Sequence, residues 1–180
     1  MTTATTAEDK VLRLMAEKYP TKEIVYEKII YLKSQLMLPK GTEHFMSDLH
    51  GAYDSFFHIL NNCSGVIKEK VDYCFGERMT EEEKAEFCTL IYYPKESLER
   101  LGQQHYLRKD WYKVTLNQLI KVLQCVSEKY TRSKVRKALP AQYSYITQEL
   151  THEDSMNPKK SAYVGAILDT IIDTGQADDF

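Results

Sequence analysis

The chain has 180 residues, which is enough for one domain with a buried core. Hydrophobic residues make up 43% and charged residues 28%, a composition typical of a globular protein and unlike that of a disordered chain. The net charge of −2 gives no general attraction to nucleic acid, and no apolar run is long enough to span a membrane. The four cysteines form no CxxC pair and no apolar leader follows Met1, so we expect a reducing, cytoplasmic location.

Helical spacing of apolar residues dominates the chain from its start. Helices capped by threonine are expected after Thr6 and Thr21, and Thr80 with Glu83 has the spacing of a capping box. Ser64 and Asp110 are placed to cap two further helices. Later helices are expected at 133–139, at about 141–150 and at about 161–174, with Gly175 as a C-cap and a loop at 151–161.

The longest expected helix begins near Asp110 and carries a regular apolar stripe. Its members repeat at intervals of three and four residues: Tyr112, Leu116, Leu119, Leu123, Val126 and Tyr130. Such a stripe predicts a single core seam along one side of the helix.

Residues 42–47 form the one segment with the pattern of a short strand. A single strand cannot make a sheet, so either this segment is not a strand or its partners lie outside this chain. The residues therefore predict a mostly α fold with one or few short strands.

Asp48 and His50 follow this segment directly, within SDLHG at 47–51. In an extended backbone, residues two apart point the same way, so a carboxylate and an imidazole would converge on one cation. This mixed donor pair suits ions such as manganese, iron or zinc. Gly51 permits a tight turn, and a helix starting near Tyr53 would direct its N-terminus at the same place, which favours a phosphate.

A second interpretation of the same residues stays open. Asp48 can instead cap the following helix, with His50 as a surface residue. Two ligands do not complete a metal site, and no other residues here have ligand spacing. His58 is a further candidate for supporting the pair.

The segment KYTRSKVRKALP, residues 129–140, is the second candidate site. It contains a cluster of cations that could hold phosphate groups: Arg132, Lys134, Arg136 and Lys137. The alternative is a solvated helix face balanced by nearby acids. Nucleic-acid binding by this segment is a third hypothesis, which the net charge disfavours.

Several stretches together resemble one known family. LPKGTEHFMSDLHGAYDSFFHILNNCSGVIKEKVD is similar to the start of a class III (Firmicutes-type) fructose-1,6-bisphosphatase. TLIYYPKESL, DWYKVTL, KYTRSKVRKALP and TIIDTGQADDF resemble the same family in the same order, so the resemblance covers the chain after its first ten residues. SDLHG is shared with the wider calcineurin-like metallophosphatases and is less specific.

The resemblance implies a two-metal phosphatase of gluconeogenesis that releases the 1-phosphate of fructose 1,6-bisphosphate, usually with manganese. Its D-x-H motif corresponds to Asp48 and His50, which would both bind one of the metals. The implied fold is the amino-terminal part of an αββα-type α/β metallophosphatase with a large helical region. The domains would be N-terminal helices at 1–41, the first core strand, loop and helix at 42–62, and a helical subdomain at 63–180.

The chain also departs from the pattern of the superfamily. The GDxxDRG and GNHD motifs, which supply other metal ligands, do not occur in it. The resemblance therefore implies an amino-terminal portion that is inactive alone, because it holds only the first ligand motif. The alternative function is a helical regulatory or oligomerisation module that binds a phosphorylated effector through residues 129–137, with a homo-oligomer as a further expected partner.

Overall fold

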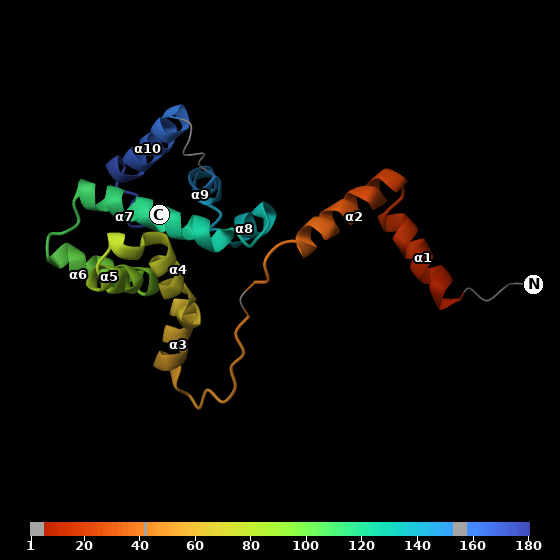
Figure 1. Ribbon diagram of the computed structural model, residues 1–180, viewed down its shortest axis with the longest axis horizontal. Helices are drawn as coiled ribbons and strands as arrows, with labels where there is room; N and C mark the ends of the chain where they lie inside the picture. The colour runs from red at the N-terminus through yellow and green to blue at the C-terminus, as the bar shows by residue number, and fades with distance from the viewer. Residues whose placement is uncertain (1–5, 42, 153–157) are drawn as a thin grey trace, which may run out of the picture. The chain divides into compact units, whose positions relative to one another are not determined.

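The computed structural model describes residues 6–41, 43–152 and 158–180. Within these ranges the secondary structure consists of ten α-helices and two short 3₁₀ turns, which confirms the mostly α class (Figure 1). Contacts divide the chain into two units, residues 1–40 and 41–180. The proposed further boundary at residue 62 stays a prediction.

The first unit consists of α1 (Ala7–Lys18) and α2 (Lys22–Leu36). Thr6 caps α1 in a reciprocal box with Asp9, and the Thr21 hydroxyl accepts the Ile24 N–H at 3.4 Å, so both expected caps are confirmed. Neither helix buries a residue. Most of their large apolar side chains are exposed, so this unit does not form a core of its own.

The second unit contains the remaining elements: α3 (Tyr53–Asn62), η1 (Cys63–Gly65), α4 (Val66–Phe75), η2 (Gly76–Arg78), α5 (Glu81–Tyr92), α6 (Pro94–Gln103), α7 (Lys109–Ser127), α8 (Arg132–Ala138), α9 (Ser144–Thr151) and α10 (Pro158–Asp173). The helix α7 lies between α4 on one side and the α9–α10 pair on the other (Figure 1).

The helix α7 contributes to two hydrophobic cores rather than to one seam. Val122 and Cys125 pack with residues of α4 and α5. Leu116 and Ile120 pack with residues of α9 and α10. The single stripe expected from the sequence is therefore wrong in two respects, because α7 is covered on two sides and ends at Ser127, before Tyr130.

Some of the caps expected in the second unit are observed and others are not. Thr80 and Glu83 form the expected capping box, and Gly175 takes the positive φ of 70° that favours glycine after α10. Ser64 is not a cap but lies in a left-handed conformation, and Arg108 occupies the N-cap of α7 in place of Asp110. Of the loop expected at 151–161, residues 153–157 lie outside the described residues, and 158–161 begin α10.

The strand expected at 42–47 is not observed. Residue 42 lies outside the described residues, and residues 43–47 belong to neither a helix nor a strand. A strand needs a neighbour for its N–H and C=O groups, and the described part of this chain provides none.

No helix among the described residues is both long enough and apolar enough to cross a membrane.

Candidate functional site

Asp48 and His50 lie on a tight turn just before α3. The Ala52 N–H donates to the Leu49 carbonyl at 2.9 Å, which closes a four-residue turn over His50 and Gly51. His50 and Gly51 both have positive φ, 47° and 71°, as in a type I′ turn. Asp48 also has a positive φ of 58°. The extended backbone expected here is therefore wrong, and a folded turn takes its place.

The turn nevertheless brings the two predicted ligands together. Asp48 Oδ2 lies 3.6 Å from His50 Nε2, and their side chains are 82% and 78% exposed. Asp and His tolerate the left-handed region better than most residues, but it remains sparsely populated. Such strained conformations concentrate at functional sites, so they support the hypothesis that this turn has a role beyond connecting two segments.

The geometry of this pair is compatible with one shared cation. Oxygen and nitrogen donors about 2.1 Å from a metal at tetrahedral or octahedral angles lie roughly 3.0–3.4 Å apart. The observed 3.6 Å therefore needs only a small side-chain adjustment. Among the residues that the structure describes, no group of three or more His, Cys, Asp or Glu side chains is placed to hold a metal. The pair is thus at most part of a site.

The start of α3 is available to a ligand. Its N-cap residue is Ala52, and no side chain caps the helix, so the alternative in which Asp48 caps α3 is wrong. An uncapped helix N-terminus leaves backbone N–H groups and a partial positive charge that favour an anion. The helix begins three residues after His50. A candidate cation-binding pair and a helix terminus that favours anions therefore lie within one short segment.

Large apolar side chains surround the turn without being covered. Phe45 is 90% exposed and Tyr53 is 67% exposed, while Leu49 and Phe57 are also exposed. Tyr53 and Phe57 stack on each other along α3, with ring centroids 5.6 Å apart. An exposed apolar surface beside polar residues is typical of a protein-interaction or ligand-binding surface.

His58 belongs to an aromatic cluster at the end of α5. Its Nδ1 lies 2.6 Å from the Tyr93 hydroxyl, and the two rings stack. Tyr92 meets the same imidazole edge-on, and burial, followed by the Cys88 thiol, raises the pKa of Tyr92 to about 12. These contacts connect α3 to α5, which gives His58 a structural role.

The predicted basic residues all lie on α8 and are all exposed. Thr131 caps this short helix by accepting the Lys134 N–H at 3.3 Å. The Lys134 ammonium lies 4.8 Å from the centre of the Tyr130 ring. Arg136 and Lys137 occupy the last turn of α8.

One of the four, Arg132, lines a surface hollow of about 400 Å³. Tyr130, Thr151 and His152 line it as well, and the His152 Nδ1 is 2.8 Å from the Gln148 carbonyl. The sequence did not connect His152 with Arg132. No local signal could have found this pairing, because only the packing of α9 beside the end of α7 creates it.

Curated proteins of one name are similar to this chain over nearly its full length. Fructose-1,6-bisphosphatase class 3 of Porphyromonas gingivalis is 57% identical over 169 residues, which cover 94% of this chain and 26% of that protein. The proteins of the same name from Parabacteroides distasonis and Clostridium acetobutylicum are 55% and 50% identical over 171 residues, each covering 95% of this chain. No solved structure matches the chain.

The chain spans about a quarter of the length of these curated relatives. The model of the family described as Firmicute fructose-1,6-bisphosphatase matches residues 10–180. A match over nearly the full chain, together with relatives at this level of identity, shows that the chain belongs to the Firmicute fructose-1,6-bisphosphatase family.

Proposed function

We propose that this chain supplies part of the active site of a metal-dependent fructose-1,6-bisphosphatase, a hydrolase of the metallophosphatase type. The observation that carries the proposal is the convergence of Asp48 and His50 to 3.6 Å on a turn with left-handed backbone at both residues. The names of the relatives support the substrate, since each is called a fructose-1,6-bisphosphatase.

The residues of this chain would bind a cation and orient the substrate. The Asp48 carboxylate and the His50 imidazole would hold a divalent cation, for which manganese is our expectation. The first turn of α3, which no side chain caps, would orient a phosphate group of the sugar bisphosphate. A bound cation would stabilise negative charge on the phosphoryl oxygens. The remaining ligands would come from the part of the family protein that this chain does not span.

A chimera provides the direct test of this proposal. Residues 10–180 would replace the matching segment of the Porphyromonas gingivalis relative, and phosphate release from fructose 1,6-bisphosphate would be measured with added manganese. We expect the chimera to be active and Asp48→Asn or His50→Asn to lower kcat/KM by about 100-fold or more, because losing one ligand displaces the metal. Residues 1–180 alone should release no phosphate.

Two variants of similar chemistry serve as controls. Glu99→Gln removes an exposed carboxylate on α6, and His105→Asn replaces an exposed histidine that also has positive φ. Both should keep activity within about threefold of the chimera. An active Asp48→Asn, His50→Asn double variant would refute the assignment of these two ligands.

A second candidate function rests on the hollow beside α8. We propose that it binds a small phosphorylated molecule, because Arg132 offers a planar set of donors and His152 and Tyr130 offer further polar groups. The test is a titration of the chain with pyrophosphate, followed through the NMR signals of the hollow. Arg132→Gln should weaken binding by about tenfold, whereas Lys137→Gln, on the same helix but outside the hollow, should leave it unchanged.

A further inference from the structure

A hollow of about 280 Å³, here named the Arg100 hollow, lies among α5, α6 and α7 of the second unit. Part of its lining is apolar and comes from the buried side chains of Phe87 and Leu90 and the half-buried indole of Trp111. Its volume is just below the range of about 300–1,000 Å³ that holds drug-sized ligands, so it suits a smaller molecule. None of its lining residues belongs to the turn at 48–51 or to α8.

Four described residues with charged side chains line the Arg100 hollow: Arg78, Glu83, Glu86 and Arg100. Two of them are engaged in contacts of the fold. Arg78 Nη2 donates to the Cys74 carbonyl at 3.0 Å. Glu83 Oε2 accepts the Thr80 N–H at 2.8 Å, as part of the capping box of α5. These two side chains are therefore held in place by the protein itself.

The other two charges, Glu86 of α5 and Arg100 of α6, are exposed. Neither side chain forms a hydrogen bond or an ion pair with a residue that the structure describes, and they do not pair with each other. The hollow thus offers one carboxylate and one guanidinium beside an apolar surface. A simple anion would be repelled by Glu86 and a simple cation by Arg100, whereas a zwitterion meets each group with an opposite charge.

Thr115 of α7 adds an unpaired polar group to the lining. It is only 7% exposed, yet its hydroxyl has no hydrogen-bond partner within the described ranges. Thr147, the other buried threonine, donates to the Tyr143 carbonyl at 2.9 Å. A polar group on a buried residue is normally satisfied, so the free hydroxyl of Thr115 indicates a place for a polar ligand group. Thr115 also lines a second hollow, of about 320 Å³, beside residues 177–180.

We propose that the Arg100 hollow binds a free α-amino acid with an apolar side chain, such as leucine. The Arg100 guanidinium binds the carboxylate of the amino acid, and the Glu86 carboxylate accepts hydrogen bonds from its ammonium group. The apolar side chain of the ligand packs against Phe87, Leu90 and Trp111. This inference is independent of the phosphatase activity, because it concerns other residues and another ligand.

Trp111 is the only tryptophan of the chain, so its fluorescence reports directly on ligand entering the hollow. L-leucine would be titrated into the chain up to about 20 mM. Two analogues test the charges: 4-methylpentanoate lacks the ammonium group, and 3-methylbutylamine lacks the carboxylate. Glycine keeps both charges but lacks the apolar side chain. We expect leucine to bind about tenfold more tightly than any of the three, because each lacks one of the predicted contacts.

Variants of the two free charges should respond differently to the analogues. Glu86→Gln should weaken leucine binding by about tenfold but should not weaken binding of 4-methylpentanoate, which has no ammonium group to lose. Arg100→Gln should weaken leucine binding similarly but should not weaken binding of 3-methylbutylamine, which has no carboxylate. Both side chains are exposed, so neither change should unfold the chain, and circular dichroism would verify this.

Two exposed acids outside the Arg100 hollow provide the controls. Glu82→Gln lies on α5 but does not line the hollow, and Asp179→Asn lines the second hollow. Both should leave the leucine affinity within about threefold of the original. The absence of a saturable response to leucine, or glycine binding as tightly as leucine, would overturn the proposal. Binding that Asp179→Asn weakens and Glu86→Gln does not would place the ligand in the second hollow and refute this assignment.

Discussion

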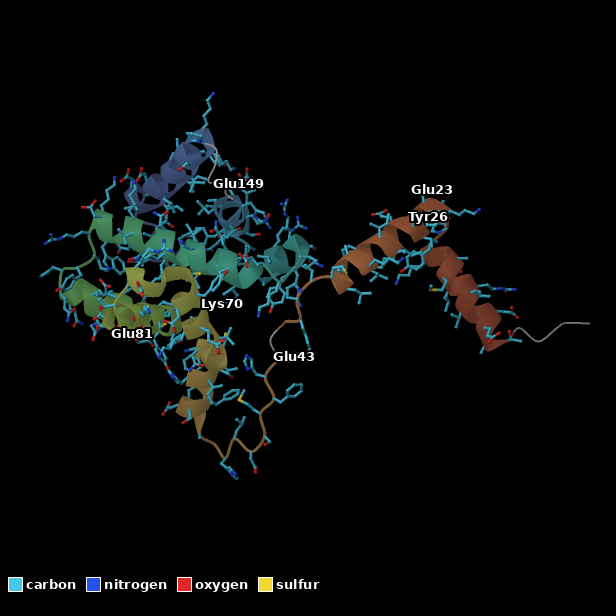
Figure 2. All side chains as sticks on the ribbon, in the orientation of Figure 1. Glu23, Tyr26, Glu43, Lys70, Glu81 and Glu149 are labelled. Carbon is cyan, nitrogen blue, oxygen red and sulfur yellow. The ribbon has the colours of Figure 1, made fainter. Side chains whose placement is uncertain are left out.

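Lys84 shows how a single buried charge connects two helices of the second unit. Its ammonium lies 2.7 Å from Oε1 of Glu81, labelled in Figure 2, and 3.3 Å from Asp72 Oδ1 on α4. The hydrogen bond to Glu81, with a further contribution from Asp72, raises the pKa of Lys84 above its ordinary 10.5. Since the folded pKa is the higher one, the stabilisation is complete below pH 10.5 and is lost as the pH rises through the folded pKa.

We expect Lys84→Met to lower the melting temperature by several degrees near neutral pH, because the buried Asp72 oxygen loses the cation that faces it. Thermal unfolding of both proteins at pH 7 and at about pH 11 would measure the difference, which should shrink at the higher pH. Lys95→Met on α6, an exposed lysine, should have little effect. An equal loss at both pH values would mean that packing of the lysine stem dominates.

The cysteines should differ sharply in reactivity. Cys63 is exposed, whereas Cys74, Cys88 and Cys125 are buried. Burial raises the pKa of Cys74 to about 11 and also raises that of Cys88, so these thiols stay protonated at pH 8. With a chromogenic disulfide reagent at pH 8, we expect one thiol per chain to react promptly and the rest only after unfolding. Cys63→Ser should abolish the fast phase.

At the scale of elements, the sequence predicted most of the helices and some of their boundaries. Reciprocal caps such as Thr80 with Glu83 are local, so three residues suffice to recognise them. Asp110 failed as a cap because Arg108 already has the extended conformation that starts α7. The two-sided burial of α7 depends on α4 and α10, which are distant in sequence, so its own apolar spacing could not reveal it.

The α7–α10 contact gives an element-scale prediction. Leu168 of α10 is 1% exposed within the core shared with α7 and α9. Leu168→Ala should lower the free energy of unfolding by about 2–5 kcal/mol, since it removes buried methyl groups and leaves a cavity. Urea denaturation measures this loss. Leu36→Ala, at a residue 83% exposed, should change it by less than about 0.5 kcal/mol.

At the scale of the whole molecule, the candidate site was predictable only in part. The spacing of Asp48 and His50 indicated two converging ligands, and the structure brings them together by a turn instead of a strand. The strand expected at 42–47 was predicted from its local pattern alone. A strand forms only beside a neighbouring strand, and the described residues include none. Further ligands of the proposed site could not be predicted from this sequence, since the chain spans about a quarter of the length of its relatives.

The two units should also differ in their contribution to the stability of the chain. Both hydrophobic cores lie within residues 41–180, while α1 and α2 bury no residue. A protein of residues 41–180 should therefore melt within about 2 °C of the full chain when both are measured at low concentration. A large fall in melting temperature would show that α1 and α2 stabilise the core.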